Sequence, residues 1–164
     1  MHIEVDQSGK IEQTNKDTAL AFSDDISYAI LIPAKVKREA IDLLRSAGRR
    51  GKRLYFLLFA AALYQLLKSH LDRLDVITID TEYEGNEQDI KLMLLNLIWK
   101  GHPSYPAANV TFCRITKKSP AHKKALAVYR KAAKADRTLT VEELVEPLMG
   151  KKWKRSGKPF QNGP

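Results

Sequence analysis

The chain of 164 residues has the size of one ordinary domain, and its 44% hydrophobic and 29% charged residues are typical of a globular rather than a disordered or membrane-embedded protein. Its one cysteine, Cys113, excludes an internal disulfide framework and a cysteine-rich zinc site, so a reducing, cytoplasmic location is the simplest expectation. Because 28 Lys and Arg residues outnumber 19 Asp and Glu residues, the formal net charge is +9, which favours a polyanionic partner.

The first 32 residues predict three antiparallel strands. Residues 3–6 alternate apolar and polar side chains, as in a half-buried strand, and the pattern ends at Asp6 before a turn that contains Gly9. Residues 18–23 and 28–32 are short apolar runs separated by a pair of aspartates, which is typical of a tight turn. We therefore expect a three-stranded antiparallel meander.

Two helices with a basic loop between them are predicted next. Pro33 begins a segment whose apolar residues have helical spacing, and residues 46–53 hold two glycines and four basic residues, which predict an exposed loop. Residues 54–71 predict a helix that is apolar on nearly every side and should pack centrally. Its longest apolar run, residues 54–67, is shorter than the ~20 residues that cross a bilayer, so we expect no membrane association.

Strands and helices then alternate along the chain. Residues 76–79 are β-branched throughout and predict a buried strand with Asp80 at its carboxyl end. Asn86 is placed to cap a helix over residues 87–99, and residues 109–115 predict another strand.

The last part of the chain predicts two helices and a tail. Ser119 and Pro120 are a favourable start for a helix over residues 120–135, and a smaller helical element is expected over residues 138–150. Residues 151–164 contain five basic residues and no acid, which predicts a flexible basic tail after a single domain over residues 1–150. The order of elements predicts an α/β fold: a mixed sheet of about five strands with helices packed on it.

Asp6 and Asp80 are the two most informative side chains. Each is predicted at the end of a strand near the centre of the sheet, where a carboxylate needs a partner or a solvated cleft. Two carboxylates a few ångströms apart are tolerated mainly with a divalent cation between them, and oxygen ligands suit Mg²⁺ or Mn²⁺. Such ions can activate water for phosphodiester cleavage. The alternative is that each Asp caps the turn that follows it.

The order of elements, together with these two acids, resembles the ribonuclease H-like superfamily. Residues 5–9, Val-Asp-Gln-Ser-Gly, resemble the Asp-Glu-Ser-Gly opening of several uncharacterised branches of that superfamily, and residues 77–80, Ile-Thr-Ile-Asp, match its fourth-strand motif. The resemblance spans residues 1 to about 136. It implies an essential Asp on the first strand, a second acid at the end of the fourth strand and a further metal-binding residue on the last helix.

Carried onto this sequence, the resemblance makes Asp6 and Asp80 metal ligands and catalytic residues. It makes His122 a metal ligand or general acid/base, although a solvated position in the first helical turn is the ordinary alternative for a lone histidine. The sequence departs from the family at Gln7, where an acid is usual. The family's acid on the first helix has only Glu39 and Asp42 as candidates, and Glu82 or Glu84, just after Asp80, are the alternatives for that missing oxygen ligand.

Basic residues gather in three places along the sequence, where they could bind the phosphates of a nucleic acid. The alternative is that they only form solvated helix faces and a tail that keeps the protein soluble. Trp153 lies among the cations of the tail and could stack on an unpaired base. The expected nucleic-acid contacts are Arg49, Arg50, Lys52, Arg53, Lys117, Lys118, Lys151, Lys152, Trp153, Lys154 and Arg155.

The leading hypothesis is therefore a ribonuclease H-like nuclease that depends on Mg²⁺ or Mn²⁺ and hydrolyses DNA or RNA, with Asp6, Asp80 and Glu82 at the metal and His122 assisting. The alternative is a non-catalytic module of the same fold that binds nucleic acid or protein. A third hypothesis is an interaction subunit that forms a homodimer through the helix that begins at Leu54.

Overall fold

The computed structural model describes residues 1–150, so the predicted basic tail over residues 151–164 lies outside the described residues. The described chain folds around one six-stranded mixed sheet with the order β5-β4-β1-β2-β3-β6. Its strands are β1 (His2–Ser8), β2 (Thr18–Ser23), β3 (Ser27–Ile32), β4 (Val76–Asp80), β5 (Val110–Cys113) and β6 (Arg137–Thr138).

The strand pairing confirms the predicted meander and the mixed sheet. β1 pairs with β2 and β2 with β3 in antiparallel fashion, whereas β4 pairs with β1 and β5 with β4 in parallel. The expectation of about five strands missed β6, which pairs in parallel with β3 over Arg137 and Thr138. Two residues are too short to show the alternation of apolar and polar side chains by which strands are recognised.

The helices begin and end close to the predicted places, with two informative differences. The α-helices of residues 1–150 are α1 (Ala34–Ser46), α2 (Gly51–Leu67), α3 (Glu87–Gly101), α4 (Pro120–Tyr129) and α5 (Val141–Met149), with short 3₁₀ helices η1 (Leu71–Arg73) and η2 (Ala107–Asn109). Because α2 begins at Gly51, Lys52 and Arg53 lie in its first turn and not in the predicted loop. Helix α4 ends six residues before the predicted Ala135, where Lys131 takes a φ of 62° and the amide of Ala132 donates to the Ala127 carbonyl.

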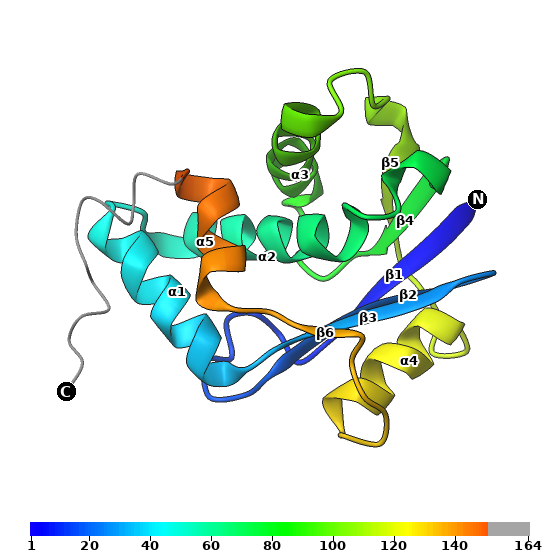
Figure 1. Ribbon diagram of the computed structural model, residues 1–164, viewed down its shortest axis with the longest axis horizontal. Helices are drawn as coiled ribbons and strands as arrows, with labels where there is room; N and C mark the ends of the chain where they lie inside the picture. Colours follow the sequence, from blue (N-terminus) through cyan, green and yellow to red (C-terminus); the bar gives the residue numbers. More distant parts are fainter. Residues whose placement is uncertain (151–164) are drawn as a thin grey trace.

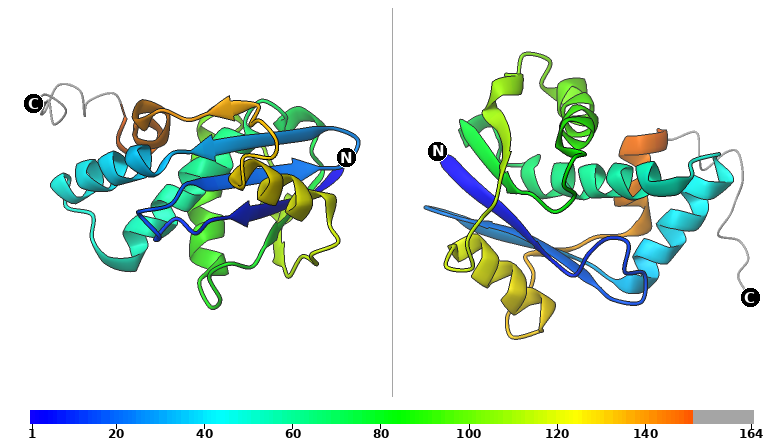
Figure 2. Two further views of the ribbon diagram at one scale, coloured as in Figure 1. Left: turned by 90° about the horizontal axis from the view of Figure 1, so that it is seen from below. Right: turned by 180° about the vertical axis from the view of Figure 1, so that it is seen from behind.

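The sheet lies between two unequal layers of helices. Figures 1 and 2 show α1, α2, α3 and α5 on one side of the sheet and α4 alone on the other. Most apolar side chains of α2 are buried in the main core, as its all-round apolar sequence predicts. This chain itself covers these side chains, and the hypothesis that α2 forms a homodimer surface stays a prediction.

Helix α4 packs closely on the opposite face of the sheet because the residues between them are small. Ala19, Ala21 and Ala29 of the sheet are fully buried against Ala125 and Val128 of α4 in a second, smaller core. Helix α4 therefore lies directly over the strands that carry the candidate site.

The loop between β1 and β2 is held in place by a buried lysine of α1. Lys37 is 1% exposed, and its ammonium donates to the carbonyls of Lys10 and Gln13 and to the Thr18 hydroxyl, at 3.1, 2.8 and 3.0 Å. Burial lowers the pKa of Lys37 to about 8. These three hydrogen bonds fix the loop that borders the candidate site described next.

Candidate metal centre

Adjacent parallel strands place Asp6 and Asp80 side by side. The register of β1 and β4 pairs Val5 with Ile79, so the next pair along the strands is Asp6 and Asp80. Because side chains alternate along a strand, Val5 and Ile79 enter the main core while both aspartates point to the α4 face. Asp80 ends β4 as predicted, but β1 continues to Ser8, so the prediction that the strand ends at Asp6 is wrong. Asp6 is consequently 4% exposed.

A third carboxylate joins these two from the loop after β4. One carboxylate oxygen from each of Asp6, Asp80 and Glu82 lies within 4.8 Å of the others. Asp6 is buried and the other two are half-buried. An all-oxygen set of this kind suits a hard divalent cation such as Mg²⁺ or Mn²⁺. The three residues that the sequence predicted as metal ligands are therefore brought together.

His122 contacts the same group. Its Nδ1 lies 2.6 Å from Oδ2 of Asp6, in the first turn of α4. Ser119 caps that helix, because its hydroxyl accepts from the Ala121 amide at 3.2 Å and donates to a carboxylate oxygen of Glu4 at 2.7 Å. The cap ties the start of α4 to β1. Among the described residues, no hydrogen-bond partner of the other His122 ring nitrogen, Nε2, is found.

Backbone amides orient the two aspartates. The Gln7 amide donates to Oδ1 of Asp6 at 2.7 Å, and the Ile115 amide donates to Oδ1 of Asp80 at 2.6 Å. Each carboxylate is thereby fixed through one oxygen by the main chain. The second oxygen of Asp6 faces His122, and the Asp80 side chain interacts with Glu82.

The three carboxylates repel one another, and burial strengthens the effect. Burial raises the pKa of Asp6, and the charge of Asp80 raises it further, against hydrogen bonds from Gln7 and His122 that lower it. Burial, followed by the charges of Asp80 and Asp6, raises the pKa of Glu82 to about 8, with Lys10 acting in the opposite direction. The acidic group is thus short of positive charge, which a divalent cation would supply.

This repulsion predicts how stability depends on pH when no divalent cation is bound. An unfolded Glu82 releases its proton near the usual pKa of 4.5, whereas the folded one keeps it until about pH 8. Between pH 4.5 and about 8 the folded state therefore binds more protons than the unfolded state. The free energy of unfolding should fall as pH rises through this range, by up to ~1.4 kcal/mol per pH unit. Urea unfolding at several pH values with a chelator measures this slope.

Glu82→Gln should flatten the slope, because the glutamine amide does not titrate. The control Asp42→Asn, on the exposed face of α1, should leave it unchanged. A Glu82→Gln protein with the wild-type slope would contradict the raised pKa.

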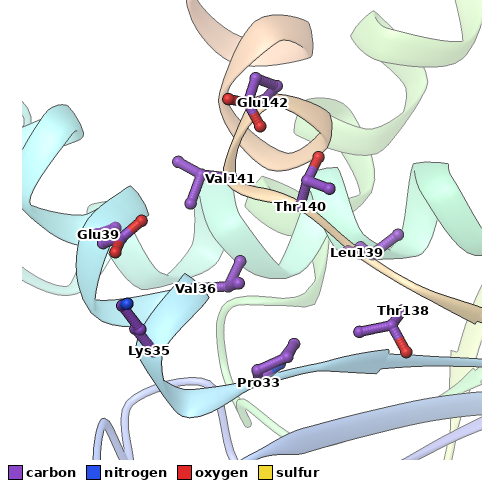
Figure 3. A pocket seen from close by; sticks show the side chains of 9 residues that line it. All are labelled: Pro33, Lys35, Val36, Glu39, Thr138, Leu139, Thr140, Val141 and Glu142. Atoms are coloured by element: carbon purple, nitrogen blue, oxygen red, sulfur yellow. The ribbon is translucent and has the colours of Figure 1, made fainter. Parts of the chain in front are cut away.

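The alternative acids on the first helix do not join the site. Glu39 lines a surface pocket of about 610 Å³ between α1 and the segment that leads into α5, shown in Figure 3 with Glu142 on its far side. Asp42 is exposed on α1, and neither belongs to the acidic group around Asp6. Glu84 pairs instead with Arg114. Of the four acids predicted as a possible third oxygen ligand, Glu82 is thus the one that lies with Asp6 and Asp80.

The predicted nucleic-acid contacts lie in separate places. Lys117 and Lys118 are exposed in the β5–α4 loop, which also supplies the Ile115 amide to Asp80. Arg49, Arg50, Lys52 and Arg53 are exposed where α1 meets α2. The remaining predicted contacts, Lys151, Lys152, Trp153, Lys154 and Arg155, lie outside the described residues.

The support that Glu4 gives to the site was not predicted from the sequence. Glu4 lies two residues before Asp6, on the same face of β1, and accepts from the Ser119 hydroxyl. The period of two in a strand places residues 4 and 6 on one face, so this signal was available in the sequence. The partner Ser119 was not predictable, because 115 residues separate the pair.

Comparisons of this chain with protein-family models, with curated proteins and with solved structures found no match. Within residues 1–150, every helix is too short or too polar to span a membrane.

Proposed function

We propose that this protein is a ribonuclease H-like, metal-dependent nuclease that hydrolyses phosphodiester bonds of DNA or RNA with Mg²⁺ or Mn²⁺. The observation that carries the proposal is the meeting of Asp6, Asp80 and Glu82 within 4.8 Å, beside His122. These residues come from two adjacent strands, a loop and the only α-helix on that face within residues 1–150, so the fold itself assembles the group.

Each residue of the site has a distinct task in this proposal. Asp6, Asp80 and Glu82 hold the cation, with Asp6 and Asp80 oriented by the amides of Gln7 and Ile115. A bound Mg²⁺ or Mn²⁺ would lower the pKa of a coordinated water and neutralise charge on the phosphodiester. His122 is positioned by Asp6 through Nδ1 and exchanges a proton at Nε2.

The charge of the protein supports a polyanionic substrate. The formal net charge is +9, and the exposed Lys117 and Lys118 lie in the same loop as Ile115, whose amide donates to Asp80. Lysines in this place would hold phosphates without reading sequence. Binding should therefore weaken as the salt concentration rises.

The second candidate function is a non-catalytic nucleic-acid-binding module of the same fold. It is favoured by Gln7, which stands where the family usually has an acid, and by Glu39 and Asp42, which lie outside the acidic group. In this case the basic surface acts alone and no bond is broken.

One assay separates the two functions. Labelled single-stranded and double-stranded DNA and RNA are incubated with the full chain in Mn²⁺, in Mg²⁺ and in a chelator. The nuclease proposal predicts cleavage that requires the divalent ion. Salt-sensitive binding with no cleavage in either metal would favour the binding module instead.

A further inference from the structure

A pocket of about 310 Å³ lies on the α2 side of the sheet, next to the loop that carries Glu82. It is lined by the loop after β1, the first turns of α2 and the loop after β4, through Glu12, Lys52, Tyr55, Phe56, Tyr83 and Asn86. Tyr83 follows the proposed ligand Glu82, and the Gln7 amide group lies near the Tyr83 hydroxyl. The segments that carry Asp6 and Glu82 thus continue into Gln7 and Tyr83, which lie near each other.

One wall of the pocket is a fixed aromatic surface. The Tyr83 ring meets Phe56 and Phe59 edge-on, with centroids 5.5 and 5.2 Å apart, and its hydroxyl donates to Glu12 at 3.0 Å. These three contacts hold the Tyr83 ring rigidly against α2 and the loop after β1.

Three other side chains of the pocket present a ring that has no ring partner or a polar group that has no partner within residues 1–150. Tyr55 is half-buried, and no ring partner for it is found among the described residues. Lys52 is exposed, and within residues 1–150 no hydrogen bond or ion pair of its ammonium is found. Asn86 donates one hydrogen bond, to the Glu84 carbonyl, and its amide oxygen has no partner in the described chain.

We infer that this pocket binds an unpaired nucleobase of the substrate, so that the substrate is a single-stranded nucleic acid. The inference rests on the proposed nuclease function. A base that stacks on an aromatic ring must be free of its complementary strand, and such stacking tolerates any base sequence. Lys52, followed by Arg53 and preceded by Arg49 and Arg50, supplies positive charge for the adjoining phosphate. The pocket volume is at the lower end for ligand sites, which suits one base.

The test measures binding of fluorescein-labelled single-stranded DNA of mixed sequence by anisotropy, in chelator, so that no cleavage occurs. Tyr55→Ala should weaken binding about tenfold, and Tyr55→Phe, which keeps the ring, should restore it. The matched control is Tyr64→Ala, which removes a half-buried tyrosine from the same helix at a different pocket and should bind as wild type does. Circular dichroism melting verifies that each variant is folded.

A second arm replaces the DNA with an abasic strand of equal length and charge. Wild type should bind this strand about as weakly as Tyr55→Ala binds the normal strand, and Tyr55→Ala should not distinguish the two. Duplex DNA of the same sequence should bind equally to wild type and Tyr55→Ala. Equal binding of normal and abasic strands by wild type, or full binding by folded Tyr55→Ala, would overturn the inference.

The two proposals fail in different ways. Binding that depends on the bases, without Mn²⁺-dependent cleavage, would support base binding at the pocket and contradict the nuclease proposal. Mn²⁺-dependent cleavage by a protein that binds abasic and normal strands equally would support the nuclease proposal and contradict base binding at the pocket.

Discussion

The Asp6→Asn variant is expected to lose Mn²⁺-dependent cleavage by about a thousandfold while remaining folded. The asparagine side chain keeps the shape of the aspartate. Its oxygen can still accept from the Gln7 backbone amide while its NH2 group faces Nδ1 of His122 and donates to it, but it carries no charge for the cation. Because burial raises the pKa of Asp6, its charge destabilises the metal-free fold at neutral pH. The variant should therefore unfold at the same or higher urea concentration than wild type in chelator.

Cleavage rates of a labelled oligonucleotide in Mn²⁺, measured alongside urea unfolding, test this prediction. The control is Asp42→Asn, an exposed acid of α1 that lies outside the acidic group and should leave the rate unchanged. A folded Asp6→Asn protein with the wild-type rate would remove Asp6 from the metal centre.

A second large effect, on stability, is expected at Gly9, where the loop after β1 packs against α4, the helix that carries His122. Gly9 follows β1 with a φ of +78°, and a Cβ added there would lie 2.2 Å from the Asp17 carbonyl oxygen and 2.5 Å from Cε1 of Tyr129. Tyr129 is the last residue of α4, so the glycine lets β1, its loop and α4 approach closely. Gly9→Ala should lower the free energy of unfolding by about 4 kcal/mol, since it combines backbone strain with a clash against main-chain atoms.

Urea unfolding of Gly9→Ala beside Gly48→Ala separates the clash from the backbone strain. Gly48 has a φ of +90° with nothing within 4 Å of an added Cβ, so its replacement should cost only about 1 kcal/mol. Equal costs for the two variants would mean that α4 does not pack against Gly9 as tightly as the structure shows.

The predictable part of the fold comes from local patterns. The apolar runs at residues 18–23 and 76–79 and the proline and serine that begin α1 and α4 depend on neighbours in sequence, and the structure confirms those elements. The all-round apolar α2 likewise had to be central. The predictions were wrong where tertiary contacts determine the local structure. Strand β6 was missed because it forms through pairing with β3. Asn86 stands at the start of α3 as predicted, but its side chain makes no capping hydrogen bond.

The candidate site was predictable to the same degree. Asp6 and Asp80 could be placed together, because parallel strands of one sheet align their carboxyl ends, and the family resemblance pointed to the same two acids. The choice of Glu82 over Glu39 and Asp42 could not be made, because it depends on the path of the loop after β4 and on the placement of α1. The aromatic pocket at Tyr83 was also beyond sequence patterns, since it joins three segments distant in the chain.

Crystals of the protein soaked in Mn²⁺ test the central claim most directly, through the anomalous signal of the metal. We expect a manganese peak between Asp6, Asp80 and Glu82, about 2.0–2.3 Å from an oxygen of each. A fully occupied peak elsewhere, or no peak here at Mn²⁺ concentrations that support cleavage, would contradict it.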